Sequence, residues 1–346
     1  MEILKTTERI LIIQTAFLGD AILTLPMIQK LKEIYPESLI DVVSIPQTKE
    51  VFENSPYVYR VYSYDKKGNQ KSILSLIKFA LTLKKNNYTR IYSPHRSFRT
   101  SLLVYLLDNV NSFGFDTASL NFVYENKIKY DDKIHEVARN LKLIGFRIDE
   151  ENWRVLPELK VSPEVKQKIQ NLLKDINNPL VAIAPGSVWQ TKKYPEEYFE
   201  AISNYLVKKN YFVVFIGGQS DYELCNRLSS KVNENSLSFA GNLSITESVE
   251  LLRNCNLLIS NDSAPTHLGM VANIPVLTIY CSTVPGFGFF PYNKYSFSIS
   301  FDGLECKPCG IHGRKSCPIK TFDCGYKLLS DKVIEKIEEV LTSKEK

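Results

Sequence analysis

The stretch LLISNDSAPTHLGMVANIPVLTIY, residues 257–280, contains a short apolar run, a polar turn, a helix and a second apolar run. The turn at 261–263 offers side chains that favour a helix start, and Pro265 suits the first helical turn. A helix that starts where a buried strand ends directs its free N–H groups and its dipole toward an anion. With Asp262 and His267 on either side of the turn, this stretch predicts a phosphate site at the end of a buried strand.

Length and composition point to a two-domain globular protein. At 346 residues the chain is too long for one ordinary core, and its content of 44% hydrophobic and 23% charged residues is typical of globular proteins. The net charge of +5 is too mild to indicate nucleic-acid binding. No apolar run is long enough to span a bilayer, and the N-terminus has a strand pattern, so we expect a cytoplasmic protein. Its seven cysteines are expected to be reduced.

Strands and helices alternate twice along the chain, which is typical of parallel sheets covered on both faces. The expected strands are 9–15, 39–45, 89–93, 180–184, 212–217, 237–240, 257–260 and 275–280, and the expected helices are 21–35, 71–85, 164–174, 196–208, 222–232, 245–253, 266–272 and 331–342. The charged, Pro-containing region 149–179 is the expected link. We therefore predict an α/β protein with two doubly wound, Rossmann-like domains, residues 1–160 and 161–346, facing a central cleft. The last helix is a candidate to pack back on the first domain.

Ligands bind at the carboxyl ends of parallel strands, so the loops there are the candidate sites. In the first domain, Gly19 allows a tight turn and Asp20 could accept a proton from an acceptor hydroxyl. Asp20 as a simple helix cap is the alternative. In the second domain, Ser187 could donate to phosphate and Lys192 could neutralise a diphosphate leaving group. The alternative for Lys192 is a solvated surface side chain.

Two further loops carry polar side chains after strands. Asp221 follows Gly217-Gly218, and an acidic residue at such a strand end often binds ribose hydroxyls, although a helix cap explains it equally well. His95, Arg96 and Arg99 follow a strand of the first domain and could hold an anionic acceptor. A surface loop without a role is the alternative. No G-x-G-x-x-G follows either first strand, which disfavours an NAD-dependent enzyme.

Four cysteines gather near the C-terminus: Cys306, Cys309, Cys317 and Cys324. C-x2-C followed by two more cysteines could bind zinc or an iron–sulfur cluster. The later spacing lacks the second close pair of a zinc ribbon. Reduced thiols in a loop are therefore the favoured interpretation.

Taken together, these motifs resemble glycosyltransferase family 9, the ADP-heptose:lipopolysaccharide heptosyltransferases, over nearly the whole chain. The motifs that carry the resemblance are GD at 19–20 with Pro26, PGS at 185–187, Lys192 with YP at 194–195, GG at 217–218 with Asp221, and DSAPTH at 262–267. Tyr194 stands where the family more often has Trp. The cysteine-rich loop resembles one in heptosyltransferase II-like members.

The resemblance implies a GT-B fold and an inverting transfer that requires no metal or other cofactor. It assigns the acceptor to the first domain and the nucleotide sugar to the second. Carried over residue by residue, it implies Asp20 as the catalytic base, Ser187, Lys192, Asp221, Asp262, Ser263, Ala264 and His267 as donor-binding residues, and His95, Arg96 and Arg99 as acceptor-binding residues. Glu223 is close enough to Asp221 to leave the ribose assignment open.

We therefore expect an enzyme that moves a heptose or similar sugar from an ADP-sugar to a lipopolysaccharide-core or related glycan acceptor. The expected partners are the donor and a lipid-linked or oligosaccharide acceptor, with no nucleic acid. A lipid-linked acceptor would bring the enzyme to the inner membrane surface, where the lysines near residues 66–85 could help it stay. The alternatives are a nucleotide-sugar epimerase, an inactive sugar-nucleotide-binding module, or a metal-binding interaction surface at the cysteines.

Overall fold

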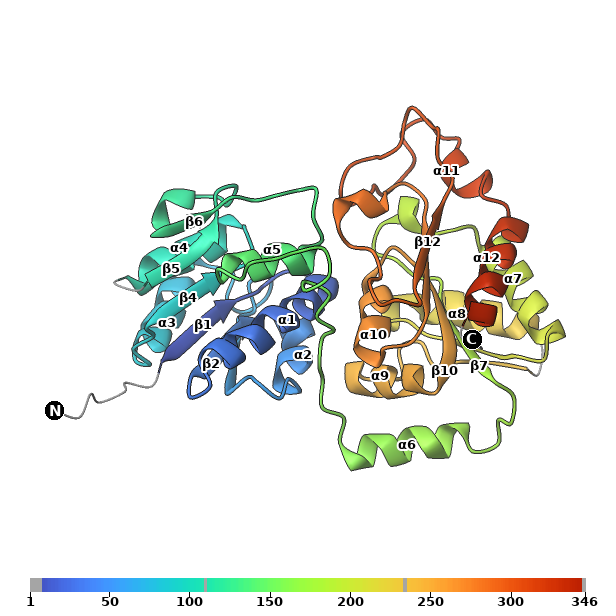
Figure 1. Ribbon diagram of the computed structural model, residues 1–346, viewed down its shortest axis with the longest axis horizontal. Coiled ribbons are helices and arrows are strands. Elements are labelled where there is room, and N and C mark those ends of the chain that lie inside the picture. The colour runs from blue at the N-terminus through green and yellow to red at the C-terminus, as the bar shows by residue number, and fades with distance from the viewer. Residues whose placement is uncertain (1–7, 109–110, 233–234, 344–346) are drawn as a thin grey trace. The chain divides into compact units, whose positions relative to one another are not determined.

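Two parallel sheets organise the chain, one in each half of the sequence (Figure 1). The computed structural model describes residues 8–108, 111–232 and 235–343. The chain divides into two compact units, Met1–Lys160 and Val161–Lys346, called unit 1 and unit 2 below. Among the described residues, no helix combines the length and the apolar character needed to cross a membrane.

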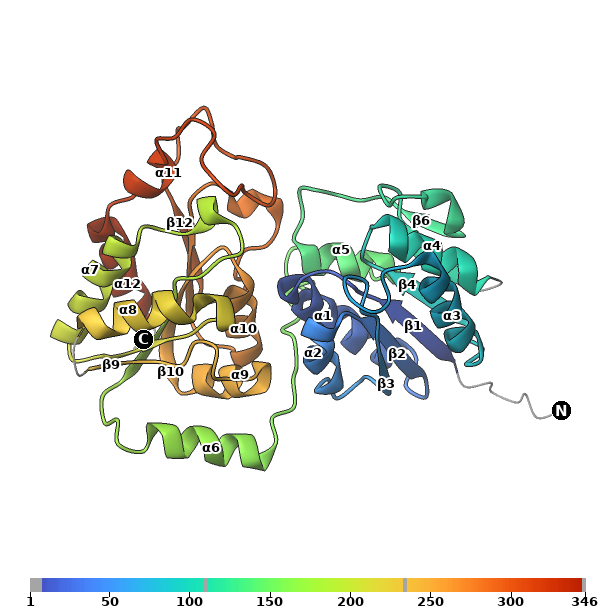
Figure 2. The same cartoon turned by 180° about the vertical axis from the view of Figure 1, so that it is seen from behind.

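Unit 1 contains a sheet with the strand order β3-β2-β1-β4-β5-β6. Its strands are β1 (Arg9–Ile13), β2 (Leu39–Ser44), β3 (Arg60–Ser63), β4 (Arg90–Ser93), β5 (Asn111–Phe115) and β6 (Asn126–Ile128). Its helices are α1 (Leu18–Ile34), α2 (Lys49–Glu53), α3 (Ile73–Lys84), α4 (Phe98–Leu107) and α5 (Glu136–Leu143). Helix α3 packs beside α4, and α1 packs beside α5 (Figure 2).

Unit 2 contains a sheet with the order β12-β11-β10-β7-β8-β9. Its strands are β7 (Leu180–Ala184), β8 (Phe212–Phe215), β9 (Ser236–Ser238), β10 (Cys255–Asn261), β11 (Val276–Tyr280) and β12 (Phe297–Ser300). Its helices are α6 (Pro163–Leu173), α7 (Glu196–Lys208), α8 (Tyr222–Val232), α9 (Ile245–Arg253), α10 (Ala264–Ala272), α11 (Asp323–Tyr326) and α12 (Ser330–Ser343). The last helix, α12, packs against α7 and β12 of its own unit.

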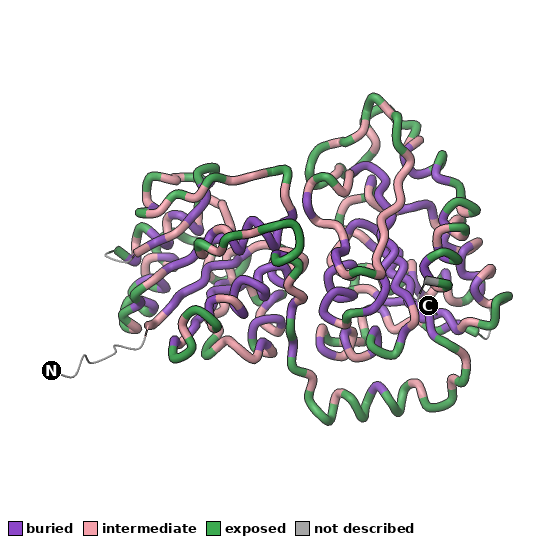
Figure 3. Tube along the Cα trace, viewed as in Figure 1, coloured by how far each residue is buried: buried purple, intermediate pink, exposed green. Residues whose placement is uncertain are grey.

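Both sheets follow the same doubly wound order, because the strand order reverses next to the first strand of each unit. The reversal lies between β1 and β4 in unit 1 and between β7 and β10 in unit 2. The central strands are buried on both faces, as expected for parallel sheets covered by helices (Figure 3). Ligands of such sheets bind at the carboxyl ends of the strands beside this reversal.

The region 94–148 is richer in regular structure than the sequence pattern predicted. His95, Arg96 and Arg99 were expected in one loop, but Ser97 caps a helix, α4, and Arg99 lies in its first turn. The Ser97 hydroxyl accepts a hydrogen bond from the Thr100 backbone N–H, as an N-cap residue does. Helix α4 was missed because its sequence is apolar on almost every side, so it lacks the period that distinguishes a helix from a strand.

Candidate active site

In unit 2, the predicted donor residues Lys192 and Asp262 form an ion pair. Lys192 ends a short 3-10 turn, η3 (Gln190–Lys192), in the segment between β7 and α7, and Asp262 directly follows β10. The Lys192 Nζ lies 2.6 Å from Asp262 Oδ2, and both side chains are largely buried. The Thr283 hydroxyl also donates to Asp262 Oδ2, at 2.7 Å. The cation is thus held in place beside the start of α10.

Asn261 ties the two loops of this site together. Its amide group donates to the Pro185 carbonyl at 2.7 Å and accepts from the Tyr194 backbone N–H at 3.0 Å. Because Asn261 is fully buried, these bonds fix both ends of the segment that carries Ser187 and Lys192. Sequence reasoning assigned the turn 261–263 to helix capping and missed this role. Two polar residues could have indicated this role: Asn261, at the end of β10, and Thr283, after β11.

The start of α10 leaves backbone N–H groups without a side-chain cap. Ser263 is the N-cap residue, but its hydroxyl donates to the Asn261 carbonyl at 3.3 Å instead of accepting from the helix. Ser263 and Ala264 are partly exposed, so an anion can reach these N–H groups. This arrangement corrects the expectation that Asp262 or Ser263 caps the helix, because the Asp262 carboxylate binds Lys192 and Thr283.

His267 lies on α10 within the same site and is buried. Its Nδ1 has no hydrogen-bond partner among the described residues. The pKa of His267 is lowered to about 4, mainly by burial; the Asp262 carboxylate opposes this shift, and the Lys192 charge adds to it. The imidazole is therefore neutral at physiological pH and leaves one buried polar nitrogen available to a ligand.

Asp221 lies against the segment that follows β7. Its carboxylate accepts from the Gly218 backbone N–H at 3.0 Å, so it closes the turn before α8, as the capping alternative predicted. A Cβ at Gly186 would lie 2.2 Å from Asp221 Oδ1, which shows how closely the two loops approach. Ser187, the next residue, is partly exposed, and its hydroxyl accepts from the Trp189 N–H at 3.4 Å. The predicted donor residues that follow β7 and β8 are therefore neighbours.

In unit 1, Asp20 lies in the first turn of α1, which follows β1 at the strand reversal. A second carboxyl group, that of Glu136 at the start of α5, is close enough for the Asp20 charge to affect its pKa. The pKa of Glu136 is raised to about 7, mainly by burial. The Arg139 and Arg96 charges oppose this shift, and the Asp20 charge adds to it. Arg139 pairs with Glu136 at 2.9 Å. Sequence reasoning missed Glu136, because no strand was recognised before it.

The three predicted acceptor residues point in different directions. His95 Nδ1 shares hydrogen bonds of 2.9 Å with the hydroxyls of Thr15 and Thr100. Burial, with the charges of Lys66 and Arg96, lowers the pKa of His95 to about 4. Of the three predicted acceptor residues, His95 is therefore an uncharged imidazole that is held in place beside β1.

The two arginines contact different parts of unit 1. The Arg96 guanidinium lies 3.8 Å from the centre of the Tyr130 ring and donates to the Thr117 hydroxyl at 3.0 Å. Arg99 instead donates to the Tyr64 hydroxyl at 3.1 Å and to the backbone carbonyl of Lys71. Arg96 thus faces the side of Asp20 and Glu136, whereas Arg99 joins α4 to the segment before α3.

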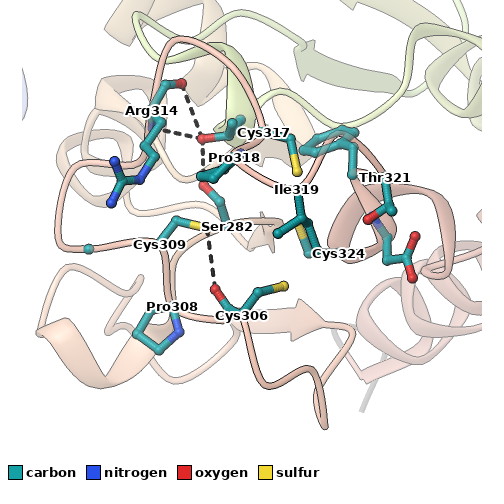
Figure 4. Close-up of a pocket in the computed structure, with 14 residues that line it drawn as sticks. Ser282, Cys306, Pro308, Cys309, Arg314, Cys317, Pro318, Ile319, Thr321 and Cys324 are labelled. Atoms are coloured by element: carbon teal, nitrogen blue, oxygen red, sulfur yellow. Dashed lines mark hydrogen bonds between the residues drawn. The ribbon is translucent and has the colours of Figure 1, made fainter.

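The four C-terminal cysteines line one cavity of about 230 Å³ (Figure 4). Burial raises the pKa of Cys324 to about 11, and burial and the neighbouring thiols raise that of Cys309. Within the described ranges, no three His, Cys, Asp or Glu side chains are arranged to hold a metal ion. The described residues therefore supply no geometry for the metal site that the cysteine spacing left open.

The cysteine-rich loop is fastened to the donor segment by backbone contacts. The Arg314 N–H donates to the Thr191 hydroxyl at 2.8 Å, and the Thr191 N–H donates to the Arg314 carbonyl at 3.1 Å. The Ser282 carbonyl accepts from the Cys309 N–H at 2.8 Å. Since Thr191 precedes Lys192, this loop supports the turn that carries the cation.

The chain is similar to known glycosyltransferases in sequence. Residues 76–319 match the sequence model of glycosyltransferase family 9 (heptosyltransferase). The lipooligosaccharide heptosyltransferase 2 of Campylobacter jejuni (strain 81116) is 24% identical over 330 residues, which cover 94% of this chain and 97% of that protein.

Solved structures share the fold over nearly the whole chain. A family 9 glycosyltransferase from Veillonella parvula superposes with a TM-score of 0.85 at 22% identity, covering 98% of this chain and 99% of that one. The E. coli ADP-heptose lps heptosyltransferase II superposes with a TM-score of 0.80 at 19% identity, covering 98% and 100%. The expected two-domain GT-B fold class is confirmed.

Proposed function

This chain belongs to glycosyltransferase family 9, the heptosyltransferase family, and we propose that it transfers a heptose or similar sugar from an ADP-sugar to a lipopolysaccharide-core or related glycan acceptor. The enzyme class follows from the family. The ADP-heptose donor is supported by the similarity to the E. coli ADP-heptose lps heptosyltransferase II. The acceptor is supported by the similarity to the C. jejuni lipooligosaccharide heptosyltransferase 2.

The ion pair between Lys192 and Asp262 at the start of α10 is the observation that carries the proposal. A nucleoside diphosphate brings several negative charges, and this site offers an ammonium group, uncapped helix N–H groups and the partly exposed Ser187 hydroxyl. Asp262 orients Lys192 before the donor arrives, so less side-chain entropy is lost on binding. The neutral His267 supplies a hydrogen bond without adding charge, and Asp221 or Glu223 binds the ribose.

The reaction is proposed as a single displacement at the anomeric carbon. The acceptor hydroxyl oxygen forms the new bond while the bond to the diphosphate oxygen breaks, which inverts the configuration. Asp20 accepts the hydroxyl proton, and Lys192 with the α10 N–H groups stabilises the charge that develops on the departing ADP. The chemistry is assigned to Asp20 of unit 1 and to the anion site of unit 2. It requires no metal.

Acceptor binding is assigned to His95, Arg96 and Arg99 of unit 1. Arg96 is the best placed, because its contacts join it to Tyr130 on the side of Asp20 and Glu136. Arg99 acts mainly by holding the segment before α3. We place the enzyme in the cytoplasm at the inner membrane surface, since a lipid-linked acceptor resides there.

A donor screen followed by product analysis tests this proposal. Thermal shifts with ADP, ADP-heptose, UDP-glucose and UDP-N-acetylglucosamine should single out the ADP compounds, because binding to the native state raises its stability. Transfer from ADP-heptose to a lipopolysaccharide-core acceptor should then yield a product whose anomeric configuration, measured by NMR coupling, is opposite to that of the donor. Retained configuration, or turnover of the donor without an acceptor into an epimer, would refute the mechanism.

A further inference from the structure

The positive charge of unit 1 is concentrated in the segment that contains α3 and α4. Residues 66–107 contain nine Lys and Arg and no Asp or Glu. The rest of the chain has 34 of the 43 basic residues and all 38 acidic ones, so its net charge is −4. The positive charge of the whole protein therefore comes from this one segment.

Five lysines of the segment are exposed and lack an acidic partner. None of them takes part in an ion pair in the described parts of the chain, whereas most other helices here carry paired charges. These lysines are Lys67, Lys71, Lys78, Lys84 and Lys85. Exposed basic side chains without partners attract an anionic surface, and each contributes about 1 kcal/mol near a charged membrane.

Apolar side chains lie between these lysines on the outer face of α3. Leu74, Lys78, Leu81 and Lys85 follow one another at helical spacing and share one stripe. Leu74 is 72% exposed and Leu81 is 56% exposed, although leucine usually packs inside. The opposite stripe of α3, which includes Leu76 and Leu83, packs in the core.

The neighbouring helix α4 extends this face. Phe98 and Tyr105 are 52% and 62% exposed, and Leu102 between them is partly exposed. Helices α3 and α4 pack side by side, so we group the exposed residues of both helices (Figure 2). We call this group the basic–apolar face: Ile73, Leu74, Lys78, Leu81 and Lys84 of α3, Lys85 directly after it, and Phe98 and Tyr105 of α4.

This face borders the proposed acceptor loops. Helices α3 and α4 follow β3 and β4, so both start at the strand ends where Asp20 also lies. Lys66, just before α3, donates to the Thr15 carbonyl at 2.6 Å, and Arg99 of α4 contacts the Lys71 carbonyl. The segment before α3 thus contacts both the β1–α1 loop and the start of α4.

We propose that the basic–apolar face binds an anionic phospholipid membrane, with Leu74, Leu81 and the aromatic rings entering the headgroup region and the lysines contacting lipid phosphates. Interfacial helices combine an apolar face with basic residues in this way. Lysine stems lie along apolar surface while their ammonium groups reach the phosphates. The proposal rests on the proposed function in one respect: a lipid-linked acceptor gives the membrane contact its use.

Co-sedimentation of the full chain with lipid vesicles tests the proposal. The protein should bind vesicles of equal parts phosphatidylglycerol and phosphatidylcholine, bind phosphatidylcholine alone weakly, and dissociate in high salt. K78E/K85E should weaken binding by at least about twentyfold, since each lysine contributes about fivefold. L74S/L81S should also weaken it, without changing the charge.

Matched controls come from α6 of unit 2, which also carries exposed lysines and leucine. K166E/K174E has the same charge change as K78E/K85E, and L172S is the counterpart of the leucine changes. These variants should bind vesicles like the wild type. If the wild type ignores anionic vesicles, or if the α6 variants lose binding equally, the proposal is overturned. A dimer that dissociates in K78E/K85E without any vesicle binding would identify a second copy as the occupant and also overturn it.

The test separates this proposal from the proposed function. Transfer to a short, water-soluble core fragment should be unchanged in K78E/K85E and L74S/L81S, because neither change touches the catalytic residues. Vesicle binding by a protein that transfers no heptose would refute only the function. Transfer without vesicle binding would refute only the membrane face.

Discussion

The two units present the same strand reversal, yet their polar groups are organised differently. In unit 2, Lys192 pairs with Asp262, and Asn261 binds Pro185 and Tyr194, so these contacts fix the loops around a prospective anion. In unit 1, Asp20 lies near a second carboxyl group, Glu136, and the arginines bind neighbouring elements. A preorganised cation suits a diphosphate, whereas a carboxylate beside another acidic group suits proton transfer. Under the proposed function, the same topology serves two kinds of chemistry.

Replacing Asp20 should produce the largest effect and test the division of labour directly. Asp20→Asn keeps the size and removes the base, so sugar transfer should fall by about a hundredfold to ten-thousandfold. ADP affinity, measured by calorimetry, should not change, because the donor residues lie in unit 2. Asp132→Asn, at an exposed position of the same unit, should transfer at the wild-type rate. A wild-type rate in Asp20→Asn would refute its assignment as the base.

Acid should weaken unit 2 through His267. The pKa of His267 is lowered from 6.5 to about 4 in the folded protein, so the folded state resists protonation. Stability is therefore complete above about pH 6.5 and is lost as the pH falls toward 4, by about 3 kcal/mol in total. His267→Gln should flatten this dependence.

The fluorescence of the two tryptophans can follow this loss of stability in one unit at a time. Trp153 lies in unit 1 and Trp189 in unit 2, so fluorescence in a Trp153→Phe background reports unit 2 alone. His95 should cause a similar loss of stability of unit 1 in acid, which the fluorescence of Trp153 reports in a Trp189→Phe background. If acid lowers the stability of unit 2 equally in His267→Gln, the pH dependence does not come from His267.

Alkali should weaken unit 1 through Glu136, the opposite response to that of His267. The pKa of Glu136 is raised from 4.5 to about 7, so the folded state favours its protonated form. Its contribution is complete below about pH 4.5 and is lost as the pH rises through 7, by about 3 kcal/mol. Glu136→Gln should therefore raise stability at pH 8 relative to pH 5, as seen in urea unfolding monitored by Trp153. Glu125→Gln, on the same unit, is the control.

The smallest expected effect concerns Lys192 and its neighbour. Lys192→Met should weaken ADP binding by about tenfold or more, because it removes the cation while keeping the side-chain length. Lys193→Met should bind ADP normally, since Lys193 forms no ion pair within the described residues.

A double variant distinguishes binding from folding. Lys192→Met leaves the largely buried Asp262 without its cation and should also lower stability. Adding Asp262→Asn should restore stability without restoring ADP affinity. Recovery of both, or unchanged affinity in Lys192→Met, would count against the donor site.

Local sequence patterns were enough to predict the fold class and most elements of unit 2. Helices 196–208, 222–232 and 245–253 and strand 180–184 match the structure residue for residue, because hydrophobic period and capping residues are local properties. The family motifs also located the loops that carry Asp20, Lys192 and Asp262. Elements of the region 94–148 were missed, since a uniformly apolar helix and short edge strands lack a clear period.

Only the tertiary structure decided which of these residues meet. Lys192 and Asp262 are far apart in the sequence and pair only because β7 and β10 are neighbours in the sheet. The same holds for Asn261 with Pro185. In unit 1, the packing of α1 against α5 brings Glu136 near Asp20. No local pattern encodes such contacts, because strand order brings distant loops together and burial then sets their protonation. The arginines at 96 and 99, three residues apart, are separated for the same reason: each binds a different neighbouring element.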